Sequence, residues 1–208
     1  MKCKSAIELP DFIDAAGRSV LLHSCCAPCS SAILEFLLQH DVAPTVFYSN
    51  SNIFPLSEYE HRCNEIRHYL HDLSIPFVED VYDHQEWLDY VRGLENQPER
   101  GARCLRCFEF RLKRAAEYAK EHGFAVIATT LASSRWKSLE QIAVAGEWAV
   151  RKISVEGELV FWNQNWRKGG LQNRRNALLK ENGFYNQQYC GCEFSMRRLE
   201  TQAENKNA

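Results

Sequence analysis

Seven of the nine cysteines in this 208-residue chain fall into three short clusters. The clusters are Cys25-Cys26-Ala27-Pro28-Cys29, Cys104-Leu105-Arg106-Cys107 and Cys190-Gly191-Cys192. Two thiols separated by two residues can reach one metal centre, because a single backbone turn directs both sulfurs to the same side. The spacing therefore predicts a metal or iron–sulfur site that carries out redox chemistry.

A cubane iron–sulfur cluster requires about four thiolates, and iron in such clusters prefers sulfur ligands. Cys104 and Cys107 can supply two of them, and the first cluster can supply the others from among Cys25, Cys26 and Cys29. Zinc would accept the same four sulfurs in a closed structural site. Two features favour iron–sulfur chemistry: adjacent cysteines are unusual in a zinc site, and seven clustered thiols exceed one closed site by three.

The Cys190-Gly191-Cys192 segment has a single residue between its sulfurs, so a disulfide across it would be strained and easily reduced. This pair is predicted either to relay electrons as a redox-active dithiol or to help hold a second metal ion. Cys63 is interpreted as structural, and Cys3 is assigned no role.

Composition limits the classes of protein that need to be considered. The chain is 45% hydrophobic and 25% charged, as is usual for a globular domain, and its net charge of −2 gives no overall sign of nucleic-acid binding. An odd number of cysteines and no recognisable signal peptide argue against a secreted disulfide framework. No apolar run approaches the roughly 18 residues of a membrane helix. We therefore expect a cytoplasmic protein without membrane contact.

Strand and helix patterns alternate along the chain, which predicts an α/β fold with an open, mostly parallel sheet flanked by helices. The predicted strands are 19–23, 45–48, one beginning at 77–78, 125–129 and 158–161. The predicted helices are 30–38 with Ser30 as its N-cap, 57–73, 85–91, 108–122, 138–150 and 173–181. The first cysteine cluster follows the first strand, at the sheet edge where ligands of such folds bind. We expect the three clusters to meet there in one pocket.

Three segments are predicted along the chain. Residues 1–18 form an N-terminal extension, 19–199 a single α/β catalytic domain that includes the Cys-Gly-Cys segment, and 200–208 a disordered tail.

Several motifs, in this order, resemble the cobalamin-independent epoxyqueuosine reductases of the QueH family. They span 23–30, 48–55, 58–62, 93–95, 99–107, 129–131 and 189–192, so the resemblance covers the chain from about Val20 to Ser195. One departure is Ser49-Asn50-Ser51-Asn52, where an Asn-Pro-Asn core is expected.

The resemblance implies a fold similar to that of the nucleotide α-hydrolases (HUP or PP-loop-like). Enzymes of that group carry paired glycines in a phosphate loop after the first strand, and this chain has Ser24 to Ser30 there instead, so ATP use is not expected. The implied reaction is the last step of queuosine biosynthesis. It reduces the epoxide of epoxyqueuosine, at the wobble position of a tRNA anticodon, to an alkene, using two protons and two electrons from an external donor.

The resemblance also implies roles for individual residues. A [4Fe-4S] cluster is expected on Cys25, Cys26, Cys104 and Cys107. Cys29, Cys190 and Cys192 are expected to serve a neighbouring mononuclear iron, which could act as a Lewis acid, or an electron relay. Candidate proton donors are Tyr48, Tyr59 and Asp80.

Loops after the fourth and fifth strands are expected to contact tRNA, because they combine cations with aromatic rings. The residues concerned are Arg135, Trp136, Lys137, Trp162, Trp166, Arg167 and Lys168. Two alternatives remain open at this point: a zinc-stabilised RNA-binding protein without redox activity, and a thiol–disulfide oxidoreductase that uses Cys104 and Cys107.

Overall fold

A five-stranded parallel sheet forms the centre of the computed structural model, which describes residues 7–198. The strands are β1 (Ser19–His23), β2 (Ala43–Tyr48), β3 (Phe77–Glu79), β4 (Val126–Thr129) and β5 (Val160–Phe161), in the spatial order β3-β2-β1-β4-β5. All four strand pairs are parallel, and His23 at the end of β1 lies opposite Phe47 and Thr129. The open parallel sheet predicted from the sequence is therefore confirmed, and its carboxyl edge is formed largely by the ends of β1, β2 and β4.

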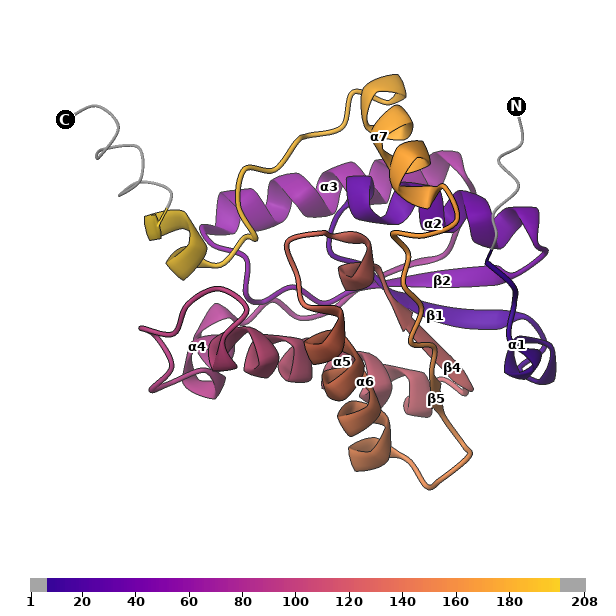
Figure 1. Ribbon diagram of the computed structural model, residues 1–208, viewed down its shortest axis with the longest axis horizontal. Coiled ribbons are helices and arrows are strands. Elements are labelled where there is room, and N and C mark those ends of the chain that lie inside the picture. The colour runs from indigo at the N-terminus through magenta and orange to yellow at the C-terminus, as the bar shows by residue number, and fades with distance from the viewer. Residues whose placement is uncertain (1–6, 199–208) are drawn as a thin grey trace.

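Helices cover both faces of this sheet (Figure 1). On one face lie α2 (Ala27–Gln39), α3 (Leu56–Asp72) and α7 (Leu171–Glu181). On the other lie α4 (His84–Tyr90), α5 (Ala102–Glu121) and α6 (Leu139–Ile153). A 3-10 turn, η1 (Thr130–Ser133), follows β4 directly. Since β1 is covered on both faces, its Val20, Leu21 and Leu22 are fully buried, as the continuous apolar run of a central parallel strand requires.

The helix α1 (Asp11–Ala15) lies within the segment predicted as an N-terminal extension. Its Ile13 is fully buried and belongs to the same core as the β1 side chains. Residues 7–18 are thus packed against the domain. Cys3 and the predicted disordered tail 200–208 lie outside the described residues.

Two helix starts differ from the prediction by three residues or more. Helix α2 begins at Ala27, so the prediction that Ser30 caps it was wrong: Cys26 is the N-cap, Pro28 stands in the first turn, and the Ser30 hydroxyl donates to the Cys26 carbonyl within the helix (2.8 Å). Helix α5 begins at Ala102, six residues earlier than predicted. As a result, Cys104 and Cys107 stand one turn apart on a helix and not in a loop before it. No helix within residues 7–198 is long and apolar enough to cross a membrane.

Candidate metal centre

The first cysteine cluster forms a compact group of thiols, which we call the trio: Cys25, Cys26 and Cys29. The chain leaves β1 and enters α2 through Cys25 and Cys26, and Cys29 follows one helical turn later. All three side chains are buried, their Sγ atoms lie within 4.8 Å of one another, and the Cys25 and Cys26 sulfurs are 3.7 Å apart. Three soft sulfur donors at this spacing fit a thiolate-binding metal such as iron or zinc, so this buried group could bind a metal.

Mutual hydrogen bonding distributes the charge of the trio unevenly. Contacts from the Cys26 and Cys29 thiols lower the pKa of Cys25 well below its ordinary value, and the cations Lys137 and Arg111 act in the same direction. Burial raises the pKa of Cys26, and the contact with Cys25 raises that of Cys29 to about 11. The trio therefore stabilises one thiolate on Cys25, and a metal ion would displace the remaining protons.

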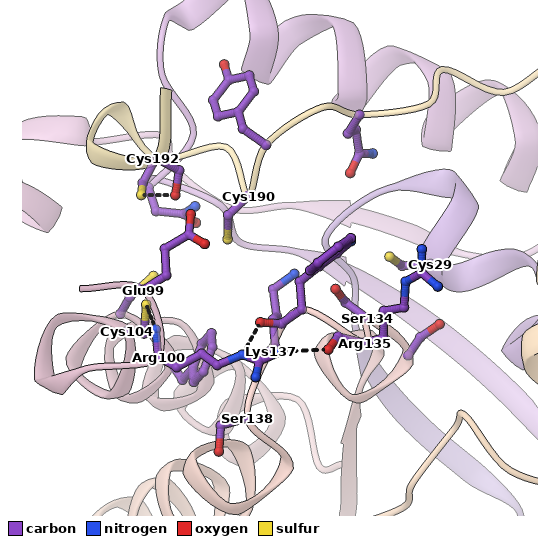
Figure 2. A pocket seen from close by; sticks show the side chains of 18 of the residues that line it. Cys29, Glu99, Arg100, Cys104, Ser134, Arg135, Lys137, Ser138, Cys190 and Cys192 are labelled. Atoms are coloured by element: carbon purple, nitrogen blue, oxygen red, sulfur yellow. Dashed lines mark hydrogen bonds between the residues drawn. The ribbon is translucent and has the colours of Figure 1, made fainter. Parts of the chain in front are cut away.

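All three cysteine clusters meet at one cavity of about 510 Å³ at the carboxyl edge of the sheet, where the sequence predicts a pocket. Five of its lining residues are cysteines: Cys29, Cys104, Cys107, Cys190 and Cys192. Figure 2 shows Cys104, Cys190 and Cys192 on one side of this cavity and Cys29 apart from them. The trio thus reaches the cavity through Cys29, while Cys25 and Cys26 lie outside its lining.

The environment favours the protonated form of three thiols, those of Cys104, Cys107 and Cys192. Burial raises the pKa of Cys107 to about 12 and that of Cys192 to about 11, and it also raises the pKa of Cys104. Two local contacts orient these sulfurs: the Arg100 backbone N–H donates to the Cys104 Sγ (3.3 Å), and the Cys192 Sγ lies 3.2 Å from the Ser195 hydroxyl.

The Cys190-Gly191-Cys192 segment is fixed to the loop before α3 by backbone contacts. The Phe54 N–H donates to the Gly191 carbonyl (2.8 Å), and the buried Arg62 guanidinium donates to the carbonyls of Tyr189 and Cys190 (3.3 Å each). Gly191 itself has a positive φ of 113°. A Cβ on Gly191 would lie 2.9 Å from the Arg62 Nη1, so both its φ and this close approach require glycine.

Lys137 is a predicted RNA-contact residue that also lies near the cysteines. It was expected at an RNA contact, and the structure places it in the cavity lining, where Figure 2 shows it between Cys29 and Cys104. Burial acts to lower the pKa of Lys137, but the sulfurs of Cys190, Cys25 and Cys29 outweigh this effect and raise it. Lys137 is therefore a fixed positive charge facing thiols of two clusters.

The candidate proton donors lie outside the residues that line the cavity. The Tyr48 hydroxyl donates to the Tyr59 carbonyl (3.4 Å), and the Tyr59 hydroxyl donates to Glu79 (3.0 Å). Burial raises the pKa of both phenols. Burial also acts to raise the pKa of Asp80, but hydrogen bonds from Arg114 and Ser49 outweigh it and lower that pKa.

The predicted RNA-contact residues divide into exposed and buried groups. Arg135 and Trp136 line the mouth of the cavity, with Trp136 71% exposed and the Arg135 guanidinium 5.1 Å from the centre of its ring. Arg167 is half-buried and donates to the carbonyls of Ser134 and Lys137, the residues on either side of that pair. Lys168 is exposed away from the cavity lining.

The expectation that Trp162 and Trp166 stack on RNA bases was wrong. Both rings are buried in the core, and the Trp166 indole N–H donates to the Thr129 carbonyl (3.1 Å). Aromatic residues near a sheet edge pack inward as readily as outward, and the sequence pattern does not distinguish the two.

Several cavity residues were not predicted from the sequence. Arg100, Arg103, Arg175 and Arg198 join Arg135 and Lys137 in the lining, and among residues 7–198 the one acidic side chain there is Glu99. Arg100, Arg103 and Asn52 belong to motifs that carry the family resemblance, which was the available signal, whereas Arg175 and Arg198 lie outside those motifs.

Comparison with known proteins identifies the family. A family profile described as "Epoxyqueuosine reductase QueH" matches residues 20–198. Three similar proteins carry the same name. The one from Haemophilus influenzae is 42% identical over 93% of this chain and 76% of its own length. That from Acinetobacter baylyi is 41% identical, with 94% and 87% covered. That from Thermotoga maritima is 36% identical, with 89% and 95% covered. With the thiol-lined cavity at the sheet edge, these matches show that the chain belongs to the epoxyqueuosine reductase QueH family.

Proposed function

We propose that this protein reduces the epoxide of epoxyqueuosine in tRNA to the alkene of queuosine. The observation that carries the proposal is the meeting of three cysteine clusters at one cavity in a member of this family. In the reaction both carbon–oxygen bonds of the epoxide break, a carbon–carbon double bond forms, and the oxygen leaves as water after taking up two protons. The two electrons come from an external one-electron reductant.

Metal binding is assigned to the thiols in two groups. Cys25, Cys26, Cys104 and Cys107 are proposed to hold a [4Fe-4S] cluster, whereas Cys29, Cys190 and Cys192 are proposed to serve an additional iron ion or an electron relay. The compact trio and the one-turn spacing of Cys104 and Cys107 on α5 support thiolate ligation. When bound, such groups supply electrons singly and Lewis acidity toward an oxygen atom.

The cavity mouth fits a nucleic-acid substrate. Its lining carries arginines from five separate segments, whose positive charge attracts phosphate, and the exposed Trp136 ring offers a surface for base stacking. The anticodon loop is single-stranded, so its modified base can leave the stack and enter a pocket. We propose that the base enters past Trp136 toward the cysteines, and that the enzyme works in the cytoplasm, where its thiols stay reduced.

The metal content of cysteine variants tests both assignments. Protein purified without oxygen is expected to be brown, to contain iron and sulfide, and to convert epoxyqueuosine in tRNA under a chemical reductant. Cys25→Ser and Cys104→Ser should lose most of the iron and sulfide together with turnover, because four thiolates are needed to hold the cluster. Cys190→Ser and Cys192→Ser should lose turnover and retain most of the iron.

Two results would contradict the proposal. Colourless protein that contains zinc would favour the zinc-stabilised RNA-binding alternative. Turnover that survives the loss of Cys25 or Cys104 would show that these thiols do not hold the redox centre. A matched control is Cys63→Ser, since Cys63 lies on α3 outside the cavity lining and its variant should retain iron and turnover.

A further inference from the structure

The loop from Ser49 to Ile53, between β2 and α3, is held in place by nearly all of its polar groups. The Ser49 hydroxyl donates to Asp80 (2.6 Å), and the Asn50 amide donates to the Ser24 carbonyl (2.9 Å) and accepts from Arg111. The Ser51 hydroxyl accepts from the Asp83 N–H (3.1 Å). The loop therefore has one well-defined conformation, fixed by partners on several elements.

Asn52 is the exception within this loop. Its side chain is 1% exposed, and neither Nδ2 nor Oδ1 has a hydrogen-bond partner among residues 7–198. A buried amide without partners destabilises a protein by roughly 1–3 kcal/mol. The neighbouring polar side chains in the loop all have hydrogen-bond partners. The lack of partners at Asn52 therefore does not reflect a poorly ordered loop.

The Asn52 side chain lines the cavity that contains the cysteines, and other unpartnered groups share that lining. They are the Trp87 Nε1, the Gln141 Oε1 and the Gln187 Nε2. Within the described part of the chain, four of the side chains that line one cavity thus have polar atoms without partners. Polar groups that stay unpaired in a binding pocket are the ones that a polar ligand satisfies, and they reject ligands that lack the matching group.

The loop that contains Asn52 is also hydrogen-bonded to the Cys190-Gly191-Cys192 segment, which contributes two of the cysteines that line the cavity. The Phe54 N–H, two residues after Asn52, donates to the Gly191 carbonyl between Cys190 and Cys192 (2.8 Å). Asn52 and these thiols are therefore held to the same piece of backbone. An amide nitrogen that carries two hydrogens is a donor and a poor ligand for iron, whereas an epoxide oxygen is an acceptor only.

We propose that Asn52 binds the reacting group of the substrate: its Nδ2–H donates to the epoxide oxygen, and its Oδ1 accepts from a hydroxyl or N–H of the same substituent. This proposal deepens the proposed function and rests on it. A donor at the oxygen stabilises the negative charge that develops there as the carbon–oxygen bonds break. It also distinguishes the epoxide from the alkene product, which has no oxygen at that position.

Two variants separate the donor from the rest of the side chain. Asn52→Leu has a similar volume and no polar atoms, and Asn52→Asp retains oxygen acceptors and lacks the N–H. Binding of the full-length protein, purified without oxygen, is measured against two tRNAs of the same sequence, one with epoxyqueuosine and one with queuosine. Iron content and the free energy of unfolding are measured on the same preparations.

The wild-type protein is expected to bind the epoxide tRNA about 5- to 30-fold more tightly than the product tRNA, the range that one hydrogen bond supplies. Both variants should lose this preference and show kcat lower by on the order of 100-fold. Asn52→Asp should bind the product tRNA as the wild type does, whereas Asn52→Leu should bind it more weakly, because it also lacks the acceptor. Their iron content should equal that of the wild type. Asn52→Leu should be no less stable than the wild type, because it removes an unpaired buried amide.

Other outcomes would overturn the proposal. An intact preference for the epoxide in Asn52→Leu would show that Asn52 does not contact that group, and a loss of iron or of stability would assign Asn52 to the metal site or the fold. Asn176→Leu is the control, since Asn176 lines the same cavity from an exposed position on α7 and should retain the preference. A wild type that turns over no epoxide would contradict the proposed function itself, a result distinct from a normal enzyme in which Asn52 has no effect.

Discussion

Lys137 shows how one side chain can influence the redox properties of the proposed centre. It faces Cys190 from the C-terminal segment and Cys25 and Cys29 from the trio. A unit charge about 10 Å away, at an effective dielectric constant of about 20, contributes roughly 1.7 kcal/mol. A positive charge in this position stabilises the reduced, more negative form of a cluster. Lys137 should therefore make the centre easier to reduce.

Lys137→Met should lower the reduction potential of the centre by on the order of 70 mV, the one-electron equivalent of that energy. A redox titration followed by electron paramagnetic resonance measures this shift. Lys137→Arg, which retains the charge, should stay near the wild-type potential. Equal potentials in all three proteins would show that the ammonium does not act on the centre.

Residue types predicted well that the cysteines gather at one cavity, and predicted the surrounding polar contacts poorly. Clustered cysteines indicate a metal or redox site from the sequence alone, because few other functions of cysteine require such spacing. Lys137 matters because it faces sulfurs that are more than 50 residues away in the sequence. Asn52 matters because its buried amide has no hydrogen-bond partner among the described residues. Composition and spacing contain no information on either property.

At the scale of elements, the position of Cys190 and Cys192 depends on α3. Arg62 on that helix is 2% exposed, pairs with Glu58 (2.6 Å) and donates to the carbonyls of Tyr189 and Cys190. Its guanidinium also lies 5.3 Å from the centre of the Tyr189 ring. One buried cation thus connects the C-terminal segment to the helix that follows the Asn52 loop.

Arg62→Met should reduce the free energy of unfolding by about 3 kcal/mol, because it leaves the Glu58 carboxylate and two carbonyls without their partner. It should also speed hydrogen exchange of the amides from Tyr189 to Cys192. Urea unfolding and exchange followed by mass spectrometry measure these effects.

Arg67→Met is the control. Arg67 pairs with Glu79 at the surface, and both side chains are more than a third exposed. The loss of this pair should change the free energy of unfolding by less than about 1 kcal/mol. An equal effect of both variants would contradict the role of Arg62.

The order of elements was predictable, whereas their starts were not. Apolar runs bounded by turns indicated all five strands, and the alternation with helices indicated the parallel sheet. The start of α5 was missed because the chain from Asn96 to Arg103 is polar, which suggested a loop that ends at the second cysteine pair. Arg103 is in fact buried at 4% exposure, with its guanidinium 4.6 Å from the centre of the Phe194 ring. Such a tertiary contact overrides the local pattern.

At the scale of the whole molecule, the charge distribution differs from the net charge. The chain carries −2 overall, yet the cavity is lined by five arginines and one lysine against one glutamate. These cations come from the segment before α5, from α5 itself, from the loop before α6, from α7 and from the C-terminal segment. Their gathering is a property of the fold and has no counterpart in the local sequence. It gives an acidic protein a positive surface where the proposed substrate enters.

Arg135→Ala should weaken tRNA binding and reduce its dependence on salt. Each phosphate that a cation neutralises contributes roughly 0.7–0.9 to the slope of log affinity against log salt concentration, so the loss of one contact should make the slope shallower by about one. The Arg135 side chain stacks on the exposed Trp136, and this variant should leave iron content unchanged.

The control is Arg151→Ala, an exposed residue in the last turn of α6, roughly 18 Å along the helix from Leu139 at about 1.5 Å per residue. Binding curves at several salt concentrations decide the outcome. If Arg151→Ala and Arg135→Ala change the slope equally, the attraction comes from the total charge of the protein. If only Arg135→Ala changes it, the phosphates lie at the mouth of the cavity.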